Sequence, residues 1–234
     1  MRLAVIPARG GSKRIPRKNV KPFCGKPMLA WSVEAALDAG CFDRVVVSTD
    51  DEEIAGVARD HGAEVPFLRP ADLSDDHTGT IPVIAHAAAA CGLSPESGDD
   101  LVCCVYDTAP FVRAADLQDG LEVLIESGAE YALSVTSFPF PIQRAVRRTA
   151  EDRLEMFDPA QFETRSQDLE EAWHDAGQFY WGRARAWLDG TPIFSSAAAP
   201  VPLARHRVQD IDTPEDWIRA ELMFQALRDQ GELG

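Results

Sequence analysis

Short apolar runs alternate with helical patterns along the first 137 residues of the chain. The apolar runs predict strands at residues 3–6, 44–48, 101–106 and 131–136. Between them, apolar positions with helical spacing predict helices at residues 27–37, 51–61, 80–90 and 114–127. Strands and helices that alternate through short connections predict an α/β fold with a Rossmann-like, doubly wound mixed sheet. In such sheets, ligands bind beyond the carboxyl ends of the strands.

The regular pattern ends after residue 136. Residues 138–175 contain the run Phe138-Pro139-Phe140-Pro141 and short strand-like pieces at 145–148 and 154–157. This composition favours a small β-rich excursion over another strand–helix unit. We expect the excursion to pack against a second copy of the chain in a homodimer.

Beyond the excursion, a strand at 178–181 is expected to return to the sheet, and the small-residue run 195–199 is expected to be a loop. Thr213 and Pro214 then mark the start of a final helix, because threonine caps helix N-termini and proline suits the first helical position. Residues 1–234 are therefore expected to form one domain.

Charge is distributed unevenly along the chain. The net charge is −15 over 234 residues, yet the first 33 residues hold eight basic residues and no acid. All four lysines of the chain lie there, and they are Lys13, Lys18, Lys21 and Lys26. An acidic chain has little affinity for nucleic acid over most of its surface, so the basic segment indicates a local anion site.

The apolar stretches and the cysteines bear on location. No apolar stretch is long enough to span a membrane, and the run before Arg9 is too short for a signal peptide. The five cysteines are odd in number and lack a CxxC spacing. These features predict reduced thiols in a cytoplasmic protein that has no membrane partner.

The first candidate site is the basic segment after the first predicted strand. It begins Ala8-Arg9-Gly10-Gly11-Ser12-Lys13 and continues to Lys18 and Asn19. It is neither a GxxxxGK[ST] P-loop nor a GxGxxG fingerprint. Adjacent glycines let backbone N–H groups approach a phosphate, while arginine and lysine neutralise its charge. We therefore expect a polyphosphate-binding loop, and the alternative is a solvated basic loop.

The second candidate site is Asp210-Ile211-Asp212, just before the final helix. On an extended segment, the carboxylates at i and i+2 point the same way, with Ile211 turned into the core. Two carboxylates together with phosphate oxygens suit one Mg²⁺ ion. The alternative is that Asp212 starts the helix without binding a metal.

Two further segments are rich in hydrogen-bonding groups. Arg69, Thr78 and Thr80 could contact the edge of a base, or their segment could be a turn followed by a helix cap. Residues between 138 and 181 could recognise an anionic sugar acid. The candidates are Gln143, Arg144, Arg165, His174, Asp175, Gln178 and Tyr180. A neighbouring His–Asp pair is more often structural than catalytic, so acid–base chemistry is not assigned to it.

Together these segments resemble the sialic-acid-type cytidylyltransferases, the CMP-sialate synthetase family. The resemblance begins at residues 6–19 and spans essentially the whole chain, through the segments 48–51, 69–70, 108–110 and 210–217. Residues 106–111, 138–144 and 165–181 look most like the pseudaminic acid branch. The sialic acid enzymes of the family usually have a glutamine where this chain has Tyr106, and an Arg-Pro-Asn-Gly-like run where it has residues 174–177. These departures fit a related nonulosonic acid better than sialic acid.

The resemblance implies roles for individual residues. The expected nucleotide contacts are Ala8, Arg9, Gly10, Gly11, Ser12, Lys13, Lys18, Asn19, Arg69, Thr78, Thr80 and Tyr106. The expected metal ligands are Asp210 and Asp212. The expected catalytic residues are Arg9, Lys13, Lys18 and Asp212. The excursion is expected to contribute to the sugar pocket as well as to the dimer.

The implied reaction is transfer of CMP from CTP to a nonulosonic acid, with Mg²⁺ as cofactor and pyrophosphate as second product. The sugar's anomeric hydroxyl would attack the α-phosphate in line. The alternatives are a CMP-sialic or CMP-legionaminic acid synthetase and, from another class, a non-catalytic CTP-binding regulator.

Overall fold

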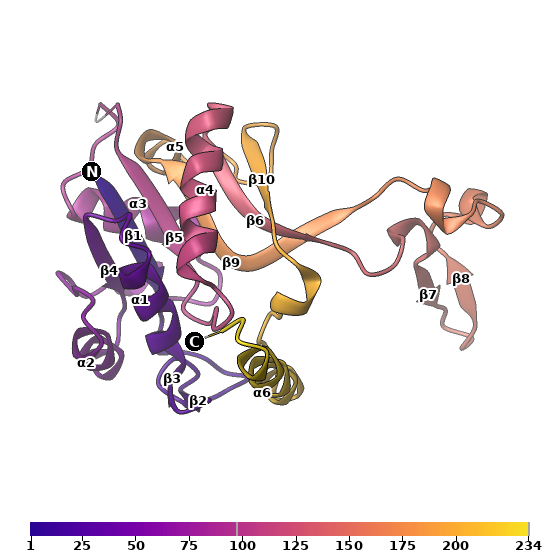
Figure 1. The fold of residues 1–234 in the computed structure, drawn as a ribbon, viewed down its shortest axis with the longest axis horizontal. Helices are drawn as coiled ribbons and strands as arrows, with labels where there is room; N and C mark the ends of the chain where they lie inside the picture. Colours follow the sequence, from indigo (N-terminus) through magenta and orange to yellow (C-terminus); the bar gives the residue numbers. More distant parts are fainter. Residues whose placement is uncertain (97, 234) are drawn as a thin grey trace.

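A computed structural model describes residues 1–96 and 98–233. Its centre is a six-stranded sheet with the order β10-β6-β9-β5-β1-β4 (Figure 1). The strands are β1 (Arg2–Pro7), β4 (Arg44–Ser48), β5 (Leu101–Val105), β6 (Tyr131–Ser137), β9 (Trp173–Arg183) and β10 (Ala198–Pro202). β9 runs antiparallel to both of its neighbours, and the other adjacent pairs are parallel. The predicted doubly wound mixed sheet is confirmed.

Helices cover both faces of this sheet. These helices are α1 (Met28–Asp38), α2 (Glu52–Asp60), α3 (Thr80–Ala90), α4 (Ala114–Ser127) and the short α5 (Ala184–Leu188). Apolar residues of α1, α2 and α4 share one core cluster, and those of α3 and α5 share the other. Successive strand residues alternate between the two cores, so Cys103 lies in the first and Cys104 in the second.

A third apolar cluster joins the two ends of the chain. The hairpin of β2 (Pro22–Phe23) and β3 (Lys26–Pro27) packs against α6 (Pro214–Asp229). The rings of Phe23 and Trp217 meet edge to face with centroids 5.3 Å apart. Ile15 and the fully buried Ile211 belong to the same cluster. This packing holds the segment before α6 beside the loop that follows β1.

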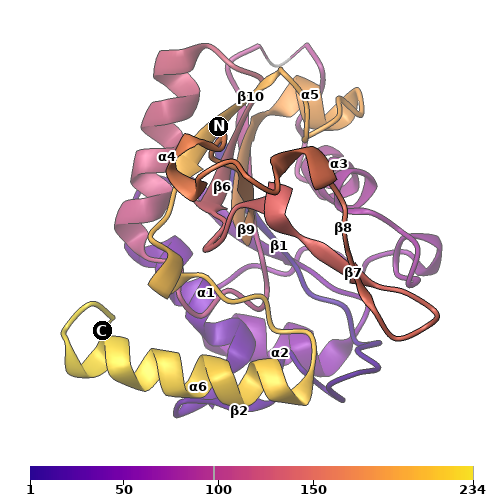
Figure 2. The same cartoon turned by 90° about the vertical axis from the view of Figure 1, so that its right-hand side faces the viewer.

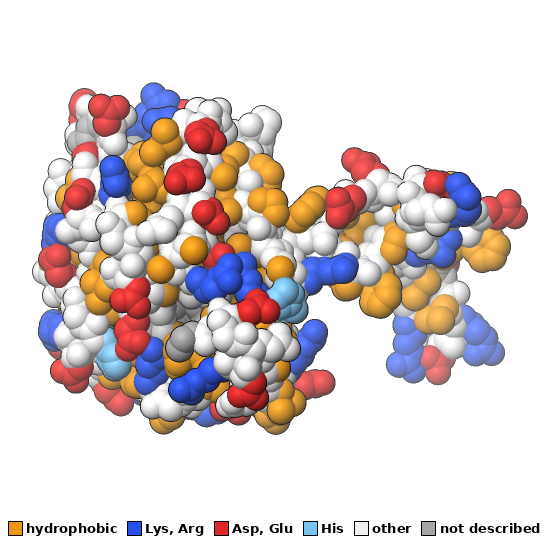
Figure 3. All heavy atoms as spheres, viewed as in Figure 1, with side chains coloured by type: hydrophobic (Ala, Val, Ile, Leu, Met, Phe, Trp, Pro, Cys, Tyr) orange, Lys and Arg blue, Asp and Glu red, His pale blue; other side chains and the backbone are white. Residues whose placement is uncertain are grey.

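Residues between β6 and β9 form an arm that projects from the body (Figures 1 and 2). The arm carries a hairpin of β7 (Val146–Arg148) and β8 (Leu154–Met156), together with short 3-10 turns. Large apolar side chains are exposed along it, as Figure 3 shows in orange. They are Phe138, Phe140, Ile142, Val146, Leu154, Phe157 and Phe162. The predicted β-rich excursion is confirmed, although residues 173–175 already belong to β9.

One local prediction was wrong in part, because residues 195–197 form a bend and turn as expected but the next two do not. The run 195–199 was expected to be a loop, but Ala198 and Ala199 begin β10 and pair in parallel with β6. β10 is an edge strand, so its outer side has no neighbouring strand. The N–H groups that Pro200 and Pro202 lack would point to that side, and no hydrogen bond of the sheet is lost. Its Val201 side chain is buried in the first core cluster. Small residues here therefore mark a sheet edge.

Candidate active site

A cavity of about 580 Å³ lies at the carboxyl ends of β1 and β5. Segments that are far apart in the sequence line it, including the loop after β1, the segment 76–80, the residues after β5 and the pair before α6. The predicted residues that line it are Arg9, Ser12, Lys13, Lys18, Asn19, Arg69, Thr78, Thr80, Tyr106, Asp210 and Asp212. The first two candidate sites therefore meet in one cavity.

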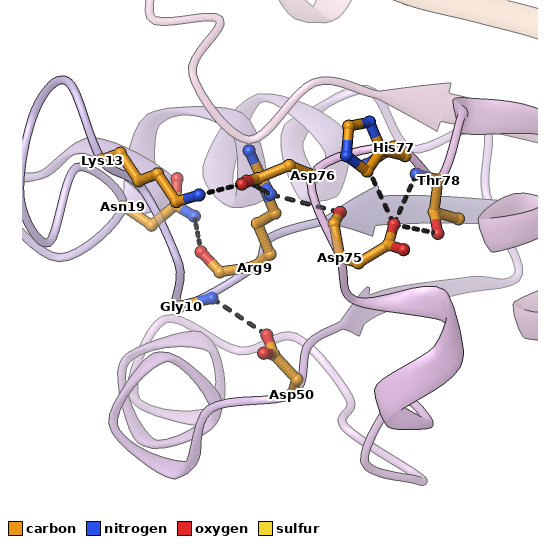
Figure 4. A network of polar contacts seen from close by, with 9 residues as sticks. All are labelled: Arg9, Gly10, Lys13, Asn19, Asp50, Asp75, Asp76, His77 and Thr78. Atoms are coloured by element: carbon orange, nitrogen blue, oxygen red, sulfur yellow. Dashed lines mark hydrogen bonds and ion pairs between the residues drawn. The ribbon is translucent and has the colours of Figure 1, made fainter.

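Backbone contacts fix the start of the loop after β1. Ala8 N–H donates to the Ser48 carbonyl at 2.9 Å, and Asn19 Nδ2 donates to the Arg9 carbonyl at 3.1 Å. Gly10 N–H donates to Asp50 Oδ1 at 2.9 Å (Figure 4). This N–H, which was expected to face phosphate, is thus bonded to a carboxylate here.

The two glycines of the loop differ in their surroundings. A Cβ on Gly10 would lie 2.6 Å from Asp51 Oδ2, so only glycine fits between β1 and the start of α2. A Cβ on Gly11 would meet nothing within 4 Å. Of these two glycines, only Gly10 is therefore required by close packing.

The four lysines fall into two groups. Lys13 and Lys18 line the cavity, whereas Lys21 lies 4.2 Å from the ring centre of Trp217, and Lys26 pairs with Glu34. Lys18 is the most fixed, since its Nζ donates to the Ile211 carbonyl at 2.7 Å and lies 3.9 Å from Asp212 Oδ1. Its side chain is 17% exposed, against 80% for Lys13.

The carboxylate pair before α6 faces the same cavity. Asp210 and Asp212 both line it, while Ile211 between them points into the core, as the extended pattern predicts. Burial, followed by the like charge of Asp212, raises the pKa of Asp210. Arg14 Nη2 lies 2.9 Å from Asp212 Oδ1. Two carboxylates that repel each other beside a cavity are suited to share a cation.

The two carboxylates fit a metal ion whose remaining coordination positions are filled by the substrate. Within residues 1–96 and 98–233, no three His, Cys, Asp or Glu side chains are grouped so as to hold a metal alone. Mg²⁺ in proteins is commonly held by one or two carboxylates together with substrate phosphates and water. Asp210 and Asp212 supply such a pair, next to the cations expected to bind those phosphates.

Polar groups beyond the loop form the inner wall. Burial lowers the pKa of Arg69, whose guanidinium donates to the Ser48 carbonyl. The buried Arg69 Nε and Asn19 Oδ1 have no hydrogen-bond partner among the described residues, so both are available to a ligand. Thr80 Oγ1 lies 3.3 Å from the Tyr106 hydroxyl, and burial raises the pKa of Tyr106 to about 12.

Residues around Thr78 form the turn that one of the two alternatives for residues 69–80 predicts. Asp75 Oδ1 accepts hydrogen bonds from His77 N–H, Thr78 N–H and the Thr78 hydroxyl, at 2.9, 2.7 and 2.6 Å (Figure 4). The segment is therefore a turn, followed by Gly79 at the cap of α3. The same turn brings Thr78 and Thr80 to the cavity wall.

The sugar-site candidates separate into two groups. His174 and Asp175 line a neighbouring cavity of about 660 Å³, which shares Asp210 with the first. The Tyr180 hydroxyl donates to Asp175 Oδ2, and its ring meets that of Tyr106 edge to face at 5.3 Å. Burial, followed by the nearby Tyr106 and Asp175, raises the pKa of Tyr180. These contacts connect Tyr106, which lines the first cavity, through Tyr180 to Asp175, which lines the second.

The remaining candidates lie elsewhere. Gln178 is buried, with Nε2 donating to the Arg207 carbonyl at 2.6 Å, so its amide supports the fold. The other three are on the arm, and each makes a contact there. Gln143 donates to the Glu170 carbonyl, Arg144 to the Thr164 carbonyl and Arg165 to Asp168. Within one chain the structure does not bring these residues to His174 and Asp175.

Sequence reasoning missed two carboxylates that line the first cavity, Asp76 and Asp107. Burial raises the pKa of Asp107, and Lys18, Asn19 and Arg69 oppose that effect. Asp107 follows β5, so the rule that ligands bind beyond strand ends could have found it. Asp76 contacts residues more than sixty positions away, and no local pattern could have found it.

Known proteins match the chain along nearly its full length. The family model described as Cytidylyltransferase matches residues 3–224. The chain belongs to the cytidylyltransferase family. Members of this family generally use a divalent metal. The membership confirms the resemblance found in the sequence, and it identifies the protein as a nucleotidyltransferase enzyme.

Relatives of this cytidylyltransferase include several sugar-activating enzymes. It is 43% identical to pseudaminic acid cytidylyltransferase of Campylobacter jejuni over 95% of both chains. It is 31% identical to CMP-N,N'-diacetyllegionaminic acid synthase of Legionella pneumophila, covering 95% of this chain and 96% of the relative. Among solved structures, a CMP:2-keto-3-deoxy-manno-octonic acid synthetase complexed with CTP matches with a TM-score of 0.69 at 19% identity, covering 97% and 99% of the chains. That likeness shows the shared fold.

Proposed function

We propose that this cytidylyltransferase couples CTP to pseudaminic acid, giving CMP-pseudaminic acid and pyrophosphate. The observation that carries the proposal is the first cavity, where Arg9, Lys13 and Lys18 face Asp210 and Asp212. This arrangement of cations and carboxylates suits a metal–triphosphate. The full-length identity of 43% to pseudaminic acid cytidylyltransferase supports the choice of sugar.

The loop after β1 would bind the triphosphate. The hydrogen bond from Lys18 to the Ile211 carbonyl holds its ammonium group in place, so its charge costs little reorganisation during the reaction. Arg9 and Lys13 would offset the charge that develops on the departing pyrophosphate. Asp210 and Asp212 would hold Mg²⁺, which when bound lends positive charge to the phosphate oxygens and favours ionisation of the attacking hydroxyl.

The second cavity would hold the sugar. It adjoins the first at Asp210, which would bring the anomeric hydroxyl near the α-phosphate for in-line attack. His174 and Asp175 line it, and Tyr180 links Asp175 to Tyr106, which lines the nucleotide cavity.

The arm would form the homodimer. Its exposed apolar side chains would be buried against the same arm or the body of a second copy. In that assembly, Gln143, Arg144 and Arg165 of one chain would reach the sugar cavity of the other. This arrangement accounts for sugar-binding residue types on an arm that is remote from its own cavity.

The proposed location is the cytoplasm. All five cysteines are free thiols, which suits a reducing compartment. Across the described part of the chain, no helix is both long and apolar enough to cross a membrane.

A panel of sugars tests the choice of substrate. Pyrophosphate release is measured with CTP, Mg²⁺ and either pseudaminic, legionaminic or sialic acid. We expect the highest kcat/KM with pseudaminic acid. A higher kcat/KM with either of the other sugars would overturn the assignment. Binding of CTP without release from any sugar would instead favour a non-catalytic regulator.

A further inference from the structure

Asp76 forms ion pairs with two of the basic side chains that are expected to bind phosphate. One carboxylate oxygen accepts from Arg9 Nη1 and the other from Lys13 Nζ (Figure 4). The two hydrogen bonds, Lys13 first and Arg9 second, lower the pKa of Asp76 to about 2, so it is an anion at neutral pH. A carboxylate with its two oxygens divided between two cations resembles one edge of a phosphate group.

The neighbouring turn aims this carboxylate at the loop. Asp75 Oδ1 holds the turn through three hydrogen bonds from His77 and Thr78, and the Asp75 carbonyl accepts from Arg9 Nη1 at 3.2 Å. Asp75 therefore maintains the shape of the segment, while Asp76 supplies the charge that faces the cavity. The two adjacent aspartates have different tasks.

The contacts of Asp76 are of the kind that a stronger anion can replace. The side chains of Lys13, Arg9 and Asp76 are 80%, 38% and 34% exposed, and ion pairs this exposed to solvent are weak. Pyrophosphate carries more charge and more acceptor oxygens than a carboxylate does. It would therefore displace Asp76 from Arg9 and Lys13, but with a lower net affinity than if Asp76 were absent.

We propose that Asp76 is an internal counter-ion of the phosphate loop, which competes with CTP and pyrophosphate for Arg9 and Lys13. The proposal rests on the proposed function of the cavity. When pyrophosphate has formed, the Asp76 carboxylate is positioned to take back both cations. Asp76 thereby weakens retention of the product as well as binding of the nucleotide.

The test is the affinity of the whole protein for pyrophosphate and CTP by titration calorimetry in the presence of Mg²⁺. Asp76→Asn removes the charge, and Asp76→Ala removes the acceptor as well. The matched control is Asp72→Asn in the same segment, which removes an equal charge. The carboxylate of Asp72 makes no hydrogen bond or ion pair among the described residues. Cytidine, which has no phosphate, is the ligand control.

Both Asp76 variants should bind pyrophosphate and CTP about 3- to 10-fold more tightly, since two weak exposed ion pairs no longer compete. Cytidine affinity should not change, and Asp72→Asn should match the wild type. Unchanged or weaker pyrophosphate binding by folded Asp76→Asn and Asp76→Ala would overturn the inference, as would an equal gain in Asp72→Asn. If the wild type binds neither CTP nor pyrophosphate, the proposed function fails as well.

Discussion

Lys13 offers the sharpest separation of catalysis from stability. We predict that Lys13→Ala lowers kcat by about 10²-fold or more, the size of effect seen when a preorganised charge-stabilising donor is removed from a transition state. The stability of the folded state should change little. The side chain is 80% exposed and its ion pair with Asp76 is of the surface type, which contributes little to stability.

The assay is pyrophosphate release at saturating CTP and sugar, together with a thermal unfolding curve for each variant. Lys21→Ala is the matched control, because Lys21 packs over Trp217 and does not line the cavity. Its kcat should stay within about 2-fold of wild type, as for most surface substitutions. A Lys13→Ala enzyme with a normal melting temperature and a kcat within about 3-fold of wild type would refute the assignment of Lys13 to the phosphates.

Three other predictions test the packing, the buried charges and the arm. Gly10→Ala should lower the free energy of unfolding by about 1–3 kcal/mol, because the new Cβ meets a carboxylate oxygen at 2.6 Å, whereas Gly11→Ala should not; chemical denaturation compares them. Arg207 is buried, and its Nη1 donates to Asp116 Oδ2 at 2.7 Å. Asp116→Ala leaves this charge without its partner and should therefore lower the free energy of unfolding by about 3–5 kcal/mol. Burial opposes ionisation of Asp116, but hydrogen bonds from arginines lower its pKa overall. The stability that the ionised carboxylate contributes is therefore fully present above the unfolded pKa near 3.9. The difference in unfolding free energy between wild type and Asp116→Ala should shrink as the pH falls below about 4. Phe162→Glu on the arm should shift a dimer toward monomer in analytical ultracentrifugation, and an unchanged dimer would place the interface elsewhere.

The sequence carried much of the fold because its local patterns were strong. Alternation along β1 placed its residues in two cores, and the capping residues Thr213 and Asp216 fixed the start of α6 through reciprocal hydrogen bonds. The run 195–199 was misjudged because alanine has a low preference for strands, and here pairing with β6 outweighed that preference.

The site was predictable only where it follows a strand or a local motif. The loop after β1 and the pair Asp210 and Asp212 could be found in this way, and the fold then brings them to one cavity. Asp76 could not, since its partners are brought to it only by folding. The division of sugar-site candidates between the body and the arm likewise depends on where the chain leaves the sheet, which residue types alone do not specify.

CMP is proposed to pass from CTP in the first cavity to pseudaminic acid in the second. The most direct measurement of this transfer is phosphorus NMR of the enzyme mixed with CTP, Mg²⁺ and pseudaminic acid, with Asp212→Ala run in parallel. We predict that a CMP-sugar phosphodiester signal and pyrophosphate rise in equal amounts with the wild type, and that neither rises above background in the variant. Release of CMP and pyrophosphate without the phosphodiester, or full activity in Asp212→Ala, would contradict the proposed transfer.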